Sequence, residues 1–173
     1  MSSEIITSEY IYRGRAVNLR VDTIKKHDGL TTTREIVEHT DCVAIIPIDD
    51  NNNVIMVRQY REAVGKHLLE IPAGGIESGE DPVEAVRREL QEEIGFIPDK
   101  ISEIGGYYSA PGYCTEFLHL YLATHLKPSR LTAEDTEDIE TIKVPISQIA
   151  MLLNSGDICD SKSIAGLLRF LSL

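Results

Sequence analysis

The segment from Asp81 to Gly95 has the start signal, the periodicity and the stop signal of one complete helix. Asp81 is a typical N-cap residue, followed by proline at the first helical position and by Glu84 at the place of a capping box. Gly95 is the residue type that most often follows the end of a helix. Apolar residues recur between these ends at three- and four-residue spacing and predict one buried stripe: Val83, Val86, Leu90 and Ile94. The chain must therefore fold with this helix packed against a core.

The same helix carries more carboxylates than its folding requires. Glu89, Glu92 and Glu93 lie three and four residues apart, so their side chains gather in one region off the apolar stripe. Like charges at this spacing destabilise an isolated helix by about 0.2–0.5 kcal/mol per pair. One explanation is a solvated acidic face, with Arg88 paired to Glu92. The other is a site for hard divalent cations, which take oxygen ligands.

The wider segment favours the second explanation. Residues 74–96 read GGIESGEDPVEAVRRELQEEIGF. Five residues separate Gly74 from Glu80, and seven more lead to Arg88-Glu89-Leu90 and then to the glutamate pair. This pattern resembles the Nudix box, GX5EX7REUXEEXGU, with every fixed position present; Phe96 stands where the family more often has an aliphatic residue. The resemblance implies a hydrolase acting on a nucleoside diphosphate linked to another group.

The resemblance also implies a metal site. Its ligands would be Glu89, Glu92, Glu93 and the main-chain carbonyl of Ala73, with Glu80 nearby through water. Two or three Mg²⁺ or Mn²⁺ ions would bind there, and clustered carboxylates can bridge such ions. Glu92 and Glu93 are also the expected catalytic residues, and Arg88 would hold the carboxylates in place. Residues 68–75 read as a short strand that runs into a glycine turn.

Residues outside the box predict the substrate. Pro111 lies sixteen residues after Gly95, and a proline at that offset resembles the ADP-ribose pyrophosphatase branch of the family. The resemblance implies that Pro111 and Gly112 belong to a substrate loop and that Glu116 contacts the terminal ribose. An ordinary proline-glycine turn is the simpler explanation.

Two arginines are further candidates for substrate binding. Arg61 ends the segment Val57-Arg58-Gln59-Tyr60-Arg61, and guanidinium groups suit bidentate contact with phosphate. In the branch that this chain resembles, the residue matching Arg61 contacts substrate, and the residue matching Arg34 reaches the adenosine from the partner subunit. Surface ion pairs would explain both arginines without a substrate.

The run EDTEDIE at residues 134–140 offers a candidate general base. Most acidic runs are solvated loops. In the branch, the matching loop supplies a carboxylate base or a further metal ligand. Asp135 and Glu137 align best as the base, and Glu137 also as the ligand. Asp135 stands where the branch often has glutamate, and a hydroxide that bridges the metals without any base is the alternative.

The remaining sequence predicts an α/β fold. Strands are expected over 4–12, 15–27, 31–38, 42–48, 54–57, 101–110, 116–124 and 139–144, and further helices over 145–153 and 161–173. Asp28-Gly29 predicts a hairpin turn. We expect a Nudix fold, a mixed sheet between helices, over 41–173, after a small N-terminal antiparallel β subdomain over 1–40. By resemblance, that subdomain exchanges between the subunits of a homodimer.

Composition excludes several function classes. A net charge of −11 argues against sequence-independent binding to nucleic acid, although bound metal would reverse the local field for a phosphate substrate. The N-terminus has no secretory signal, and no apolar run is long enough to span a bilayer, so no membrane partner is expected. Three widely spaced cysteines, Cys42, Cys114 and Cys159, are typical of reduced thiols in the cytoplasm.

The function predicted from the sequence is metal-dependent hydrolysis of ADP-ribose to AMP and ribose 5-phosphate. One alternative is another nucleoside diphosphate substrate, such as GDP-mannose or NADH. A different class of protein, a catalytically silent nucleotide sensor, is disfavoured because such domains usually have eroded boxes, whereas Arg88-Glu89 and Glu92-Glu93 are intact here.

Overall fold

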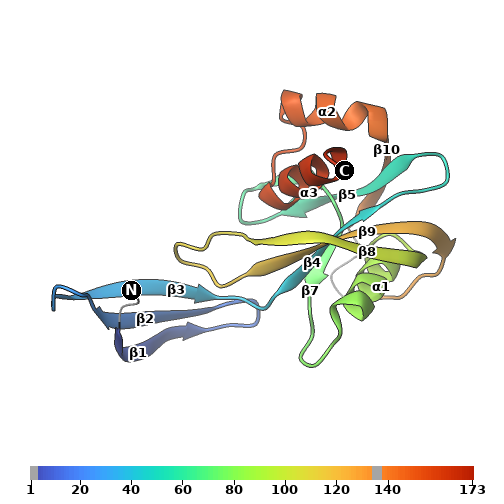
Figure 1. The fold of residues 1–173 in the computed structure, drawn as a ribbon. Helices are drawn as coiled ribbons and strands as arrows, with labels where there is room; N and C mark the ends of the chain where they lie inside the picture. The colour runs from blue at the N-terminus through green and yellow to red at the C-terminus, as the bar shows by residue number, and fades with distance from the viewer. Residues whose placement is uncertain (1–3, 134–137) are drawn as a thin grey trace. The chain divides into compact units, whose positions relative to one another are not determined.

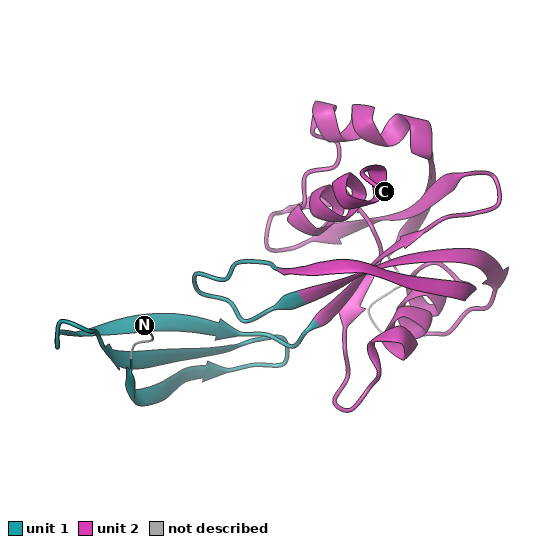
Figure 2. Ribbon diagram, viewed as in Figure 1, with its two compact units in different colours: residues 1–41, 108–117 teal, residues 42–107, 118–173 magenta. Residues whose placement is uncertain are grey.

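The computed structural model of the chain describes residues 4–133 and 138–173. These residues form two compact units, coloured separately in Figure 2. Unit 1 comprises residues 1–41 and 108–117, and unit 2 comprises residues 42–107 and 118–173. The predicted division into a subdomain over 1–40 and a hydrolase domain over 41–173 stays a prediction, and it did not anticipate that 108–117 groups with the N-terminal strands.

Unit 1 is built on one antiparallel sheet of three strands in chain order, β1 (Glu4–Arg13), β2 (Asn18–Lys25) and β3 (Thr31–Glu38). The predicted turn between β2 and β3 is present, and Gly29 adopts the left-handed φ of +83° that it requires. The segment 108–117 adds to the free edge of β3. Val37 N–H donates to the Tyr113 carbonyl at 2.7 Å, and Thr115 N–H donates to the Val37 carbonyl at 3.0 Å.

Unit 2 contains two sheets. The first has the order β10-β5-β6, with β5 (Asn53–Arg61), β6 (Lys66–Glu70) and β10 (Glu140–Pro145). The second has the order β7-β4-β9-β8, with β4 (Cys42–Pro47), β7 (Ala73–Gly75), β8 (Phe96–Tyr108) and β9 (Phe117–Pro128). This second sheet is mixed, because β4 runs parallel to β9 and antiparallel to β7.

Three helices complete unit 2: α1 (Pro82–Glu93), α2 (Ile146–Ser155) and α3 (Ser161–Leu171). Figure 1 shows α1 and α3 on opposite sides of the sheet that contains β4. Alternate side chains of β4 explain this arrangement. Ala44 and Ile46 pack in the core cluster that includes Leu167 of α3, whereas Val43 and Ile45 pack in the cluster that includes Leu90 of α1. The predicted α/β fold, with a mixed sheet between helices, is confirmed.

The helix expected from Asp81 to Gly95 forms with the predicted ends. The Asp81 carboxylate accepts from Val83 N–H at 2.8 Å, and Gly95 takes a φ of +76° after the last turn. The reciprocal half of the capping box is different, because the Glu84 carboxylate pairs with Arg87. Val86, Leu90 and Ile94 are buried as expected, and Val83 is partly buried.

The glycine pair before α1 does not form the predicted turn. Gly74 and Gly75 belong to the short strand β7, which pairs with β4, and neither has a positive φ. Among the residues that the structure describes, no helix combines the length and apolar character needed to cross a membrane.

Candidate functional site

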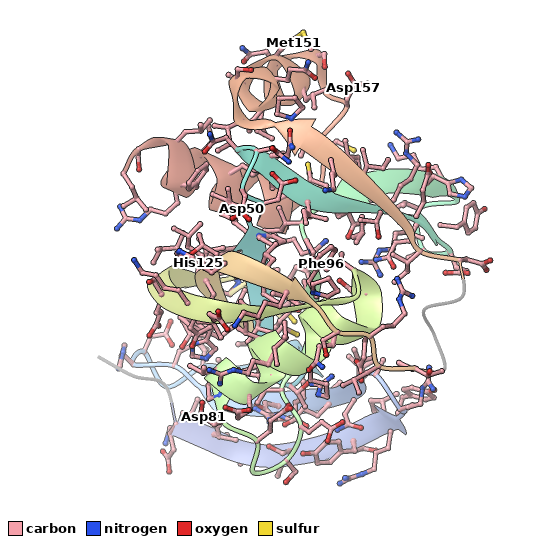
Figure 3. All side chains as sticks on the ribbon, turned by 90° about the vertical axis from the view of Figure 1, so that its right-hand side faces the viewer. Asp50, Asp81, Phe96, His125, Met151 and Asp157 are labelled. Carbon is pink, nitrogen blue, oxygen red and sulfur yellow. The ribbon has the colours of Figure 1, made fainter. Side chains whose placement is uncertain are left out.

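The carboxylates of α1 are partly taken out of water. Glu89 and Glu93 are each only 8% exposed, and Glu92 is partly buried. Helix α1 crosses β7, and this contact covers the two glutamates: Ala73 N–H donates to Glu93 Oε2 at 3.2 Å. Asp81 and Phe96, labelled in Figure 3, mark the chain on either side of this helix.

Gly74 makes room for one of these carboxylates. A Cβ built on Gly74 would overlap the Glu89 carboxylate, so any other residue at this position would displace that group. The glycine is therefore needed for close approach by a side chain and not for a turn.

Arg88 links the carboxylates that surround the helix. Its Nε and Nη2 donate to the two oxygens of Glu80, each at 2.9 Å, and Nη1 donates to Glu89 at 2.6 Å and to Glu92 at 3.2 Å. Nη2 also donates to the Gly75 carbonyl at 2.8 Å. One guanidinium thus fixes three glutamates and the end of β7, which a solvated surface pair would not do.

The electrostatics of the cluster favour a bound cation. Burial and the like charge of Glu89 raise the pKa of the Glu93 carboxyl to about 8. Burial likewise raises the pKa of the Glu89 carboxyl, although Arg88 opposes the shift. Hydrogen bonds from Arg88 lower the pKa of Glu80. The two buried carboxylates of Glu89 and Glu93 are therefore hard to ionise at the same time. A divalent cation between them would stabilise both charges, and such cations prefer carboxylate oxygen as a ligand.

The donor set at α1 therefore fits the predicted metal ligands. Glu89, Glu92 and Glu93 lie on one helix, and Ala73 lies beside Glu93. The structure brings these four predicted residues together with Glu80 and Arg88. Their catalytic and metal-binding roles stay predictions.

Arg61 lies at the end of β5 in unit 2 and is not an isolated surface group. Its Nε donates to Glu70 Oε1 at 3.0 Å, and its Nη2 donates to Glu70 Oε2 at 2.6 Å. Glu70 is buried and also accepts from Lys162 of α3. Burial alone would raise the pKa of Glu70, but the hydrogen bonds from Arg61 and the charge of Lys162 hold it below its usual range.

Three of the predicted substrate residues share a pocket within unit 1. This pocket of about 190 Å³ is lined by Arg34, Pro111 and Gly112, together with Arg20. Arg20 is held by Asp22 and Glu38, so Arg34 is the arginine with fewer internal partners: its Nη1 donates to the Thr33 carbonyl at 2.8 Å.

The other predicted substrate and base residues do not line this pocket or lie outside the described residues. Glu116 is in unit 1 but does not line the pocket, and its carboxylate lies 3.7 Å from His39 Nδ1. Asp135 and Glu137, the predicted base candidates, lie outside the described residues.

The sequence reasoning missed Glu70 and Lys162. A signal for Glu70 was present, because it is the one charged residue in the otherwise apolar run Leu68-Leu69-Glu70-Ile71-Pro72. A buried carboxylate needs partners, which here come from Arg61 and from a helix ninety-two residues further along the chain.

The structure thus has a mixed sheet between helices, and the segment that resembles the Nudix box forms α1 with its arginine-linked carboxylates. Residues 38–165 match the NUDIX domain family, and the chain belongs to that family.

Similar proteins carry related names. An ADP-ribose pyrophosphatase of Mycobacterium tuberculosis is 39% identical over 168 residues, covering 95% of this chain and 81% of that protein. An ADP-ribose pyrophosphatase of Bacillus subtilis is 33% identical over 165 residues, covering 94% of this chain and 89% of that protein. The crystal structure of an ADP compounds hydrolase superimposes with a TM-score of 0.92 at 24% identity, covering 99% of this chain and 94% of that chain.

Proposed function

We propose that this protein hydrolyses the pyrophosphate bond of ADP-ribose and releases AMP and ribose 5-phosphate. The observation that carries this proposal is the intact α1 cluster, in which Arg88 holds Glu80, Glu89 and Glu92 beside the buried Glu93. The two relatives named ADP-ribose pyrophosphatase, which align over most of the chain, support ADP-ribose as the substrate.

We propose that Glu89, Glu92, Glu93 and the Ala73 carbonyl hold two or three Mg²⁺ or Mn²⁺ ions, with Glu80 nearby through water. When bound, such ions neutralise pyrophosphate charge and lower the pKa of a coordinated water. The buried position of Glu89 and Glu93 excludes bulk water from one side of the cluster. Arg88 keeps the carboxylates in place while substrate binds, because its five N–H donors are already committed to them and to Gly75.

The chain itself would orient the substrate and the attacking water. Glu70 takes one donor from Nε and one from Nη2 of Arg61, and the other N–H groups, which face the Gln59 amide, suit a phosphate oxygen in its place. Asp135 or Glu137 would orient or deprotonate the attacking water, and the alternative is that no residue of the chain serves as the base. The water oxygen would form a bond to one phosphorus while the bridging P–O bond breaks, so that the products are AMP and ribose 5-phosphate.

The pocket of unit 1 is our candidate for the adenosine end of the substrate. Arg34, Pro111 and Gly112 line it, and its volume of about 190 Å³ suits part of a nucleoside better than the whole substrate. We propose that Glu116 contacts the terminal ribose, as the resemblance implies.

We propose that the protein works as a homodimer through unit 1. Among the described residues of that unit, Asp22 is the one that is fully buried. Ile5, Ile11 and Tyr12 of β1 are each more than half exposed. A three-stranded sheet is stable only with a covered apolar face, and a second copy would provide the cover. Sedimentation velocity at micromolar concentration should give a dimer, and a monomer would refute this assembly.

Kinetics with a panel of substrates distinguishes ADP-ribose hydrolysis from hydrolysis of another nucleoside diphosphate compound. With Mg²⁺ present, kcat/KM for ADP-ribose should exceed that for GDP-mannose and NADH by at least about tenfold, since a single well-placed polar contact discriminates by that much. A higher kcat/KM for GDP-mannose or NADH would still show a pyrophosphohydrolase, but it would refute ADP-ribose as the preferred substrate.

Tight binding of ADP-ribose without turnover in Mg²⁺ or Mn²⁺ would instead support the nucleotide sensor. The intact cluster on α1 argues against that class, because a sensor has no need for buried carboxylates that raise the free energy of the folded state. We further expect the protein in the cytoplasm, as its few, widely spaced cysteines suggest.

A further inference from the structure

Four charged side chains form a chain of ion pairs on the α3 side of unit 2. Arg61 donates twice to Glu70, and Glu70 Oε2 also accepts from Lys162 Nζ. Lys162 Nζ donates in turn to Asp160 Oδ1 at 3.0 Å. Positive and negative groups alternate along this chain, so each buried charge has an opposite neighbour.

Of the four side chains in the chain of ion pairs, Arg61 is the most exposed and Glu70 the least. The Arg61 side chain is 41% exposed, whereas that of Glu70 is 1% exposed and that of Lys162 is 16% exposed. A surface pair of this kind would have two accessible partners. Here the accessible arginine pairs with a buried carboxylate, and Arg61 and Lys162 are the two cations that stabilise its charged form.

The geometry leaves part of the guanidinium available. Arginine has five N–H donors, and Glu70 takes one from Nε and one from Nη2 of Arg61. The fork with Glu70 fixes the plane of the guanidinium. With the Gln59 amide in the orientation that satisfies its hydrogen bonds, Gln59 Oε1 accepts from Arg61 Nη1 at 3.1 Å. A phosphate oxygen would replace this amide oxygen at Arg61 and leave the pair with Glu70 intact.

The first turn of helix α3 contacts both Glu70 and the residue after it. Asp160 caps this helix by accepting from Ser163 N–H at 3.1 Å, which places Lys162 in the first turn. The Ser163 hydroxyl accepts from Ile71 N–H at 2.8 Å, so the same turn fixes the residue after Glu70. The first turn of α3 therefore binds the Glu70 side chain through Lys162 and the Ile71 main chain through Ser163, and it fixes the position of residues 70–71.

The ion-pair chain also lies close to the α1 cluster along the backbone. Glu70 is three residues before Ala73, whose N–H donates to Glu93 Oε2 at 3.2 Å. The ion-pair chain therefore adjoins the residues to which the proposed function assigns the metal ions.

From this arrangement we infer that Lys162 and Glu70 are positioning residues, which hold Arg61 in the orientation that binds the substrate phosphate. This inference rests on the proposed function for the identity of the ligand. Lys162 acts only through Glu70 and Arg61, and it contacts neither substrate nor metal.

A double-mutant cycle on Arg61 and Lys162 tests the inference. Lys162→Met removes the charge and keeps the aliphatic stem, and it should raise KM for ADP-ribose about tenfold while kcat stays within about twofold. Arg61→Ala should raise KM more. Lys162→Met should then add less than about twofold in the Arg61→Ala background, because the effect of Lys162 passes through Arg61.

The matched control is Lys66→Met. Lys66 lies on β6 beside Cys159, is exposed, and carries the same charge outside the chain of ion pairs. Its kinetic constants should stay at the wild-type values. If Lys66→Met and Lys162→Met changed KM equally, the loss of any nearby positive charge would explain the effect. If the effects of Lys162→Met and Arg61→Ala on KM were additive, Lys162 would not act through Arg61. Either result overturns the inference.

A measurement without substrate keeps this inference separate from the proposed function. In ¹⁵N-labelled protein, the Nε–H resonance of Arg61, assigned by its loss in Arg61→Ala, reports the fork with Glu70. It should be protected from solvent exchange in wild type and in Lys66→Met, and shifted or broadened in Lys162→Met. An unchanged resonance in Lys162→Met would refute the positioning role. Absence of any pyrophosphatase activity in wild type would refute the proposed function instead.

Discussion

Replacement of Gly74 by alanine should separate folding from metal binding. The backbone of Gly74 is not in the left-handed region, so alanine can adopt its conformation. The new Cβ would overlap the Glu89 carboxylate, which is the far end of a flexible side chain. The expected response is rotation of Glu89 away from the cluster, with little change in the strands around it.

Rotation of Glu89 breaks its 2.6 Å hydrogen bond with Arg88, and a hydrogen bond between charged groups contributes about 1.5–3 kcal/mol of stability. Loss of glycine's freedom in the unfolded chain offsets about 0.4–1 kcal/mol of this. At about 2–4 °C per kcal/mol for a chain of this length, Tm should fall by about 1–10 °C. Displacement of a metal ligand should cost about 100-fold in Mn²⁺ affinity and in kcat/KM, or about 2.7 kcal/mol.

The assay combines calorimetric titration of Mn²⁺ with thermal unfolding and steady-state kinetics. Gly156→Ala is the matched control, since Gly156 caps α2 with a φ of +82° and a Cβ there would meet nothing within 4 Å. The control should lose about 1–2 kcal/mol of stability from left-handed strain and keep wild-type kcat/KM. If Gly74→Ala kept wild-type Mn²⁺ affinity, the assignment of Glu89 as a metal ligand would be refuted.

Ser163→Ala removes the acceptor of the buried Ile71 N–H and should lower the free energy of unfolding in urea by about 1–3 kcal/mol; a loss below about 0.5 kcal/mol would contradict it. In EDTA, Tm should fall as pH rises from about 5 to about 8, because the raised pKa of Glu93 means that the folded state holds a proton that the unfolded state releases, and saturating Mg²⁺ should reverse the trend. A Tm that rose with pH over this range in EDTA would contradict the raised pKa of Glu93. Arg88→Lys keeps the charge but loses the fork that links the glutamates, so kcat/KM should fall about 100-fold; near-normal activity would show that Arg88 is not needed to hold them.

Local signals in the sequence were sufficient for α1. The cap at Asp81, the stop at Gly95 and the spacing of Val86 and Leu90 correspond to the observed helix, because each depends on residues within a few positions of one another. The pairing of Arg88 with Glu92 follows from helix geometry in the same way.

The burial of Glu89 and Glu93 could not be predicted, because it depends on contact with β7. Gly74 illustrates the difference. The sequence suggested a turn, the most common use of paired glycines, whereas the structure uses Gly74 to admit a carboxylate from another element. Close approach of two elements leaves no local pattern.

The ion-pair chain behind Arg61 was missed for a related reason. Glu70 and Lys162 are separated by ninety-two residues, and no periodicity relates a strand residue to the first turn of a distant helix. The grouping of 108–117 with β3 is a similar long-range pairing, made through main-chain bonds of Val37 that any residues could form.

Product analysis with ADP-ribose and Mg²⁺ tests the central claim most directly. Wild-type protein should release AMP and ribose 5-phosphate in equal amounts. The double variant Glu92→Gln/Glu93→Gln keeps the shapes of both side chains and removes two carboxylate charges, so it should lose at least about 1,000-fold of the rate, about 4 kcal/mol of transition-state stabilisation. Full turnover by the double variant would contradict the assignment of the α1 carboxylates as the catalytic metal site.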